Sequence, residues 1–275
     1  MLTALHVVNV QYNNVFSRIF SHLLSDKVTV EVREVDVLKL RCVTYIKRHK
    51  NINVRKLDKA VKSQRNRLLL SNFDVMEELR PFGYKPFYSS ELKRQLCTNT
   101  ALVLLSLVKN TVKVGLVDIN ADYTDFVKYL LKFTDDLTVV TLATKVYTQT
   151  ANMLLEETGA PIRLSKTADS LSDCDLIIAP KGVEDTKVFK KDALILSDRK
   201  LKDNTHKNYV FDYVVELPDS LCGLCPSYLD KTYLASALYS VEKLYRLGSL
   251  IPTLVVCENT VHTIASLKNK LRVTR

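Results

Sequence analysis

Apolar and polar side chains alternate in two stretches near the start of the chain, residues 28–33 and 38–42. This period of two predicts half-buried β-strands. A further strand is expected over residues 4–10 and a helix over 15–24. Residues 54–68 keep apolar side chains at helical spacing and place basic residues between them, which predicts an amphipathic helix.

The pattern changes after Val112 to short continuous apolar runs that alternate with helical stretches. A strong helix over residues 90–109 precedes this region, and helices are expected over 123–133, 146–157 and, briefly, 168–172. Strands that are joined by such helices imply right-handed crossovers and a parallel sheet covered on both faces. The expected strands are residues 114–119, 137–142, 161–164, 176–179 and 193–196.

The signal becomes irregular after Ser197 and recovers in a helix over residues 229–247 and a last amphipathic helix over about 260–271. The expected fold class is α/β, a Rossmann-like parallel sheet flanked by helices, with a smaller N-terminal α/β domain. We expect an N-terminal domain at 1–88, a Rossmann-like domain at 89–215, and a C-terminal helical segment at 216–275 that packs back on the others.

Residues 113–197 resemble the nucleotide-binding half of Rossmann-fold dehydrogenases, and the stretch Ala168-Asp169-Ser170-Leu171-Ser172-Asp173-Cys174-Asp175-Leu176-Ile177-Ile178-Ala179-Pro180 is the most characteristic part. With a smaller α/β domain before it, the layout is similar to that of shikimate dehydrogenase and its relatives. The resemblance implies an oxidoreductase that binds a dinucleotide between two domains.

The glycine content departs from that family. Composition at about 7% would give about 19 glycines, whereas the chain has six, none closer than 23 residues to another. The turn after the first parallel strand is Asp118-Ile119-Asn120-Ala121-Asp122-Tyr123, so carboxylates stand where glycines would admit a pyrophosphate. The second strand ends without an acid for a ribose hydroxyl, and Ala101 stands where the shikimate enzymes have a catalytic Asp. We therefore expect no cofactor, and no dinucleotide in particular.

The acidic turn is nevertheless a candidate cleft site. Clustered carboxylates at a strand end favour Mg²⁺, and the set resembles that of haloacid-dehalogenase phosphotransferases, although Asn120 stands where that family has a second Asp. The alternative, which we favour, is that Asp122 caps the following helix. The cleft candidates are Asp118, Asn120, Asp122, Thr141, Lys181 and Asp198, with Asp125 and Asp203 nearby.

Cys222-Gly223-Leu224-Cys225 is a single CxxC motif. Such a motif can be half a zinc site or a redox pair, with Cys257 and His262 as the other possible ligands. Their spacing is a poor match to known zinc sites, so we expect structural thiols and no metal.

Positive charge is concentrated in one segment. The chain carries a net charge of +10, and residues 39–67 contain eleven cations against one anion, Asp58, so the remainder is neutral. Such a segment suits a phosphate backbone, with Tyr45 available to stack on a base, although a solvated surface is the plainer alternative. The anion-binding candidates are Lys47, Arg48, Lys50, Arg55, Lys59, Lys62 and Arg65.

These observations favour a cytoplasmic, non-enzymatic binding or regulatory protein with an anionic partner, which could be nucleic acid, an acidic protein or an anionic lipid surface. The scattered cysteines indicate a reducing compartment, and the longest apolar run, residues 101–108, is too short to span a bilayer. The alternative is an atypical oxidoreductase or a metal-dependent phosphotransferase that uses the inter-domain cleft. The sequence leaves the oligomeric state open.

Overall fold

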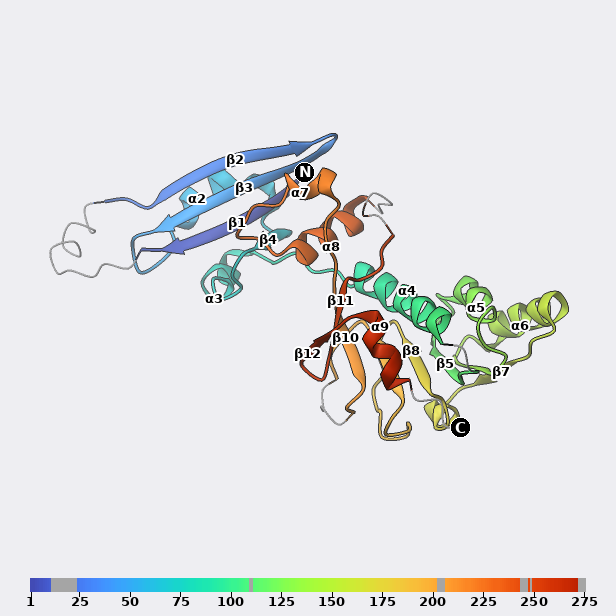
Figure 1. The fold of residues 1–275 in the computed structure, drawn as a ribbon. Helices are drawn as coiled ribbons and strands as arrows, with labels where there is room; N and C mark the ends of the chain where they lie inside the picture. The colour runs from blue at the N-terminus through green and yellow to red at the C-terminus, as the bar shows by residue number, and fades with distance from the viewer. Residues whose placement is uncertain (11–23, 109–110, 202–205, 243–246, 248, 272–275) are drawn as a thin grey trace. The chain divides into compact units, whose positions relative to one another are not determined.

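The chain forms two compact units (Figure 1). The structure, a computed structural model, describes residues 1–10, 24–108, 111–201, 206–242, 247 and 249–271. Unit 1 comprises residues 1–89 and 217–248, and unit 2 comprises residues 90–216 and 249–275. The helix expected over 15–24 falls almost entirely outside the described residues, as does Asp203.

Unit 1 is built on a four-stranded sheet in the order β2-β3-β1-β4. β1 runs parallel to both β3 and β4, and β2 forms an antiparallel hairpin with β3. The alternating pattern correctly predicted β2 and β3, and the strand expected over residues 4–10 corresponds to β1. The strands are β1 (Leu2–Asn9), β2 (Lys27–Val35), β3 (Leu38–Lys47) and β4 (Leu68–Leu70).

Helical segments cover both faces of this sheet. Successive side chains along a strand point to opposite faces, so each strand contributes to the packing on both. On one face, Val7 and Tyr45 pack with Leu57 of the first helix in a buried cluster. On the other, the neighbouring residue His6 stacks on Tyr228, with ring centroids 4.4 Å apart. The helices of unit 1 are α2 (Val54–Val61), α3 (Met76–Leu79), α7 (Asp219–Cys222) and α8 (Lys231–Glu242).

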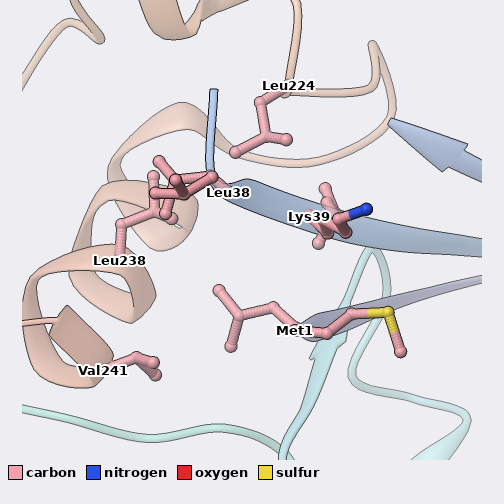
Figure 2. A pocket seen from close by; sticks show the side chains of 9 residues that line it. Met1, Leu38, Lys39, Leu224, Leu238 and Val241 are labelled. Atoms are coloured by element: carbon pink, nitrogen blue, oxygen red, sulfur yellow. The ribbon is translucent and has the colours of Figure 1, made fainter. Parts of the chain in front are cut away.

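A small pocket of about 120 Å³ lies in unit 1, where the start of β1 and β3 meets α8 (Figure 2). Its lining is almost entirely apolar, and its charged residue, Lys39, forms an ion pair with Glu34. Ligand sites combine an apolar wall with several convergent polar groups. This pocket lacks such convergent polar groups, so it does not indicate a ligand site.

Unit 2 contains an eight-stranded sheet whose six parallel strands follow the order β7-β6-β5-β8-β9-β10. This is the strand order of the Rossmann fold, and it confirms the expected Rossmann-like class. An antiparallel hairpin continues the sheet beyond β10. The strands are β5 (Val114–Val117), β6 (Leu137–Val140), β7 (Ile162–Ser165), β8 (Leu176–Ala179), β9 (Leu194–Ser197), β10 (Tyr209–Val214), β11 (Leu254–Cys257) and β12 (Thr260–His262).

Helices flank this sheet as the sequence predicted. α4 contacts β8, β9 and β10, and α6 contacts β7. Throughout the part of the chain that the structure describes, no helix is long and apolar enough to cross a membrane. The helices of unit 2 are α4 (Glu91–Leu107), α5 (Thr124–Leu130), α6 (Thr144–Thr158) and α9 (Ile264–Leu267).

Two helix predictions were wrong in extent. The helix expected over 54–68 ends at Val61, because Lys62 adopts a φ of 57°, and β4 begins at Leu68. The first residues of the helix expected over 260–271 form strand β12 instead, because Glu258 and Asn259 both take positive φ and reverse the chain into a hairpin. Helical structure begins only at Ile264. The segment at 216–275 is therefore not wholly helical, and it is divided between the two units.

Candidate functional site

α2 and the residue that follows it carry three exposed basic side chains, Arg55, Lys59 and Lys62. α2 buries Leu57 and Val61 against the sheet. Arg55 and Lys59 lie four residues apart and share one face of the helix, and Lys62 directly follows its last residue. The Asn53 side chain caps the helix by accepting the backbone N–H of Lys56 at 3.1 Å.

A buried carboxylate holds the loop that precedes α2. Asp26, only 3% exposed, accepts the backbone N–H groups of Arg48 at 2.8 Å and His49 at 3.3 Å. It also accepts the Tyr45 hydroxyl, which in turn accepts the backbone N–H of Asn53 at 2.7 Å. Burial disfavours the charged form, yet these hydrogen bonds hold the pKa of the Asp26 carboxyl below its usual value.

A second carboxylate, Glu78, holds the same loop from α3. It accepts the backbone N–H of Ile52, and its other oxygen pairs with the Lys47 ammonium at 2.5 Å. Lys47, Arg48, His49 and Ile52 are thus held by carboxylates that lie more than twenty residues away in sequence. The loop is ordered before any ligand arrives, which lowers the entropic cost of binding.

Two of the seven anion-binding candidates are neutralised within the chain. Lys47 pairs with Glu78, and Arg65 pairs with Asp58 at 2.6 Å. Among the described residues, the other five candidates have no carboxylate within ion-pair distance. We call these five the basic surface: Arg48, Lys50, Arg55, Lys59 and Lys62.

Tyr45 does not stack on a base as we expected. Its side chain is fully buried, and its hydroxyl is engaged by Asp26 and Asn53. The alternation of β3 predicts the burial of Tyr45, because Tyr45 lies two residues after the buried Val43 and on the same face of the sheet.

The carboxyl edge of the parallel sheet is organised by Asp118, directly after β5. Its buried carboxylate accepts the backbone N–H groups of Asp122 at 2.9 Å and Tyr123 at 2.8 Å, and the Tyr147 hydroxyl at 2.6 Å. Burial, followed by this hydrogen bond, raises the pKa of the Tyr147 phenol. The N–H groups that face a pyrophosphate in a dinucleotide-binding turn therefore face a carboxylate of the chain itself.

The cap expected of Asp122 is wrong, because α5 begins after Tyr123 and has no side-chain cap, and the Asp118 carboxylate holds the turn that leads into the helix. Ala121 adopts a φ of 61°, which turns the chain back over the end of β5 and brings the two N–H groups onto the Asp118 carboxylate. Asp122 instead reaches Lys181, which follows β8, in an ion pair.

Two of the remaining cleft candidates, Asp198 and Thr141, have partners within the chain. Asp198 is buried and pairs with Arg94 at 2.9 Å and Arg199 at 3.0 Å. The Thr141 hydroxyl donates to the Ile119 carbonyl at 3.3 Å. Asn120 and Asp125 are exposed.

No group of three or more His, Cys, Asp or Glu side chains that could hold a metal is found in the described ranges. The acidic residues at this edge are committed to structural contacts rather than gathered around a common point. Sequence reasoning missed Arg94 and Tyr147, whose partners Asp198 and Asp118 lie 104 and 29 residues away and leave no local signal, and it missed Arg199, which pairs with its sequence neighbour Asp198.

Gly182 is required at this edge. It has a φ of 86°, and a Cβ there would lie 2.7 Å from the Arg199 side chain.

All six cysteines are free thiols. Cys225 donates to the carbonyls of Pro226 and Leu229, and burial raises the pKa of its thiol. Cys222 is exposed and lies 3.6 Å from the Leu217 carbonyl. Cys257 and His262 belong to the other unit.

Comparison with known proteins places the chain near no characterised family. No protein-family model matches it, and no curated protein matches it. Among solved structures it is similar to L-tryptophan dehydrogenase from Nostoc punctiforme, with 10% identity over 87% of this chain and 72% of that chain and a TM-score of 0.34. At this score the likeness carries no argument, so the Rossmann-like assignment rests on the strand order, and the likeness to shikimate dehydrogenase stays a prediction.

Proposed function

We propose that the protein is a non-enzymatic binding protein that recognises a polyanion through the basic surface. The observation that carries this proposal is the set of five cations on the loop before α2, on α2 and directly after it that have no carboxylate partner among the described residues. Unpaired cations on a fixed loop and helix repel one another, and a ligand that carries regularly spaced negative charge relieves this repulsion.

The carboxyl edge of unit 2 supports the non-enzymatic part of the proposal. A dinucleotide needs free N–H groups at the turn after the first strand, and the Asp118 carboxylate accepts two of them. A phosphate placed there would meet a negative charge in a site with little solvent. An oxidoreductase function would therefore need a different mode of dinucleotide binding.

The ligand class we propose is a phosphate backbone, because the described residues 47–62, which contain the basic surface, include no Phe, Tyr or Trp on which a particular base could stack. If all five cations contact phosphates, log affinity falls with log salt at a slope of about −4.5 for duplex DNA and about −3.5 for single strands. Contact through three of them gives about −2.7 on a duplex.

The test is fluorescence anisotropy with a labelled duplex and a labelled single strand over a range of salt concentrations. Reversal of Arg55, Lys59 and Lys62 to Glu should weaken binding at least tenfold and reduce the duplex slope by about 3. The matched control reverses three exposed lysines of unit 2, Lys145, Lys187 and Lys191, and should leave the slope unchanged.

Two outcomes overturn the proposal. One is that the wild type binds neither nucleic acid at about 50 mM salt, where phosphate contacts are strongest. Binding to anionic vesicles or heparin without nucleic acid would then identify another polyanion. The other is that both triple variants lose affinity equally, in which case net charge rather than this surface accounts for binding.

A further inference from the structure

β2 forms a long free edge of the sheet in unit 1. Among the described residues it pairs only with β3, through nine consecutive residue pairs without a bulge, from Lys27 with Ile46 to Val35 with Leu38. None of its nine residues is buried, and none is proline. Such an edge presents unpaired N–H and C=O groups that can accept another strand.

Two apolar side chains stand on this edge. Val30 and Val32 are 50% and 47% exposed, and they continue the face on which Val28 packs against the core. A strand added at this edge would reduce the exposure of both valines.

The charges on the opposite face are ordered so that the strand is complementary to itself. Glu31 and Arg33 both project there, with an ion pair between them at 2.9 Å. In an antiparallel pair centred on Val32, Glu31 of each copy lies opposite Arg33 of the other, and the two Val32 side chains lie opposite each other. Centring the pair on Glu31 would instead oppose two carboxylates, so the charges favour the register centred on Val32 over that one.

We propose that two copies of this chain associate through β2, antiparallel and about a two-fold axis at Val32, to form one continuous eight-stranded sheet. The two-fold axis is perpendicular to the sheet, so both α2 helices lie on the same face of the joined sheet. This association does not depend on the proposed binding of a polyanion.

The charge order gives a test by exchange of variants. E31R gives an edge with two cations at these positions, and R33E gives an edge with two carboxylates. Each variant on its own opposes like charges across the axis, and its dimer should dissociate at least tenfold more readily than that of the wild type. An equimolar mixture of the two opposes unlike charges at both positions and should dimerise, as should the double variant E31R/R33E.

Sedimentation equilibrium over the micromolar range measures these assemblies against the 31.3 kDa of one chain. Circular dichroism melts confirm that each variant is folded. E77R and K85E, which change exposed residues of unit 1 outside β2, are the matched controls and should dimerise like the wild type. A monomeric wild type overturns the proposal, and so does a mixture of E31R and R33E that stays monomeric while the wild type dimerises.

Discussion

Replacing Asp26 by Asn tests whether a buried carboxylate organises the loop that precedes α2 and carries Arg48 and Lys50. The carboxylate accepts three hydrogen bonds, from the Tyr45 hydroxyl and from the backbone N–H groups of Arg48 and His49. Asn has nearly the same shape but keeps one oxygen and loses the charge. Its amide nitrogen would face either the Tyr45 hydroxyl, which then lacks an acceptor, or the two backbone donors.

The cost follows from these contacts. A hydrogen bond to a charged acceptor contributes about 1.5–3 kcal/mol and a neutral one about 0.5–1.5 kcal/mol. D26N therefore loses one charged bond and weakens two others. The amide avoids the cost of desolvating a carboxylate, so the free energy of unfolding should fall by about 2–4 kcal/mol at neutral pH.

The pH dependence has a defined sign. The pKa of Asp26 is lowered in the folded protein from its ordinary value of 3.8. The stabilisation is therefore complete above about pH 4 and is lost as the pH falls through the lowered pKa. The difference in unfolding free energy between the wild type and D26N should shrink over that range, and urea titrations monitored by circular dichroism measure it.

Two further readouts separate organisation of the loop from its charge. Hydrogen exchange at the Arg48 and His49 amides should accelerate in D26N under native conditions. Polyanion affinity should fall although a negative charge has been removed, whereas charge alone predicts a small rise. A stability difference that stays constant from pH 7 to pH 3, or tighter binding by D26N, would refute the reasoning.

Further predictions concern the carboxyl edge of unit 2 and the CxxC motif. D118N and Y147F should each destabilise the protein, with a coupling of about 1–3 kcal/mol in a double-mutant cycle, since they share one hydrogen bond. Additive effects would contradict that contact. Millimolar NAD or NADP should leave the melting temperature of the wild type unchanged, and a clear increase would contradict the role given to Asp118. Changing Cys222 and Cys225 to Ser should leave unfolding cooperative, whereas one zinc per chain by elemental analysis would make them ligands.

The parallel sheet was predictable because its strands are continuous apolar runs with helices between them. The run at 176–179 matches β8, and the run at 137–142 contains β6. The C-terminal hairpin was not predictable in the same way, because residues 260–271 keep helical spacing. Its reversal depends on Glu258 and Asn259 in a left-handed backbone conformation, which a hydrophobic pattern does not record.

The position of the charge excess was also predictable, but its neutralisation was not. Lys47 is paired with Glu78 across 31 residues, and Asp26 holds Arg48 across 22. At the carboxyl edge, the sequence offers several acids after β5, and the backbone turn at Ala121 determines that Asp118 is the one that accepts the N–H groups of the turn. Such contacts depend on tertiary structure, so residue type and spacing could narrow the candidates without selecting among them.

The division of the chain between the units constrains how the protein is made. The chain passes between unit 1 and unit 2 three times, and α8, which contacts β4, is synthesised only after residues 90–216. The sheet of unit 1 is therefore synthesised before the segment that covers one of its faces. That face stays uncovered until residues 90–216 and then α8 have been synthesised. For the same reason, a single proteolytic cut at any of the three crossings leaves both units attached, because each unit is assembled from two separate stretches of the polypeptide.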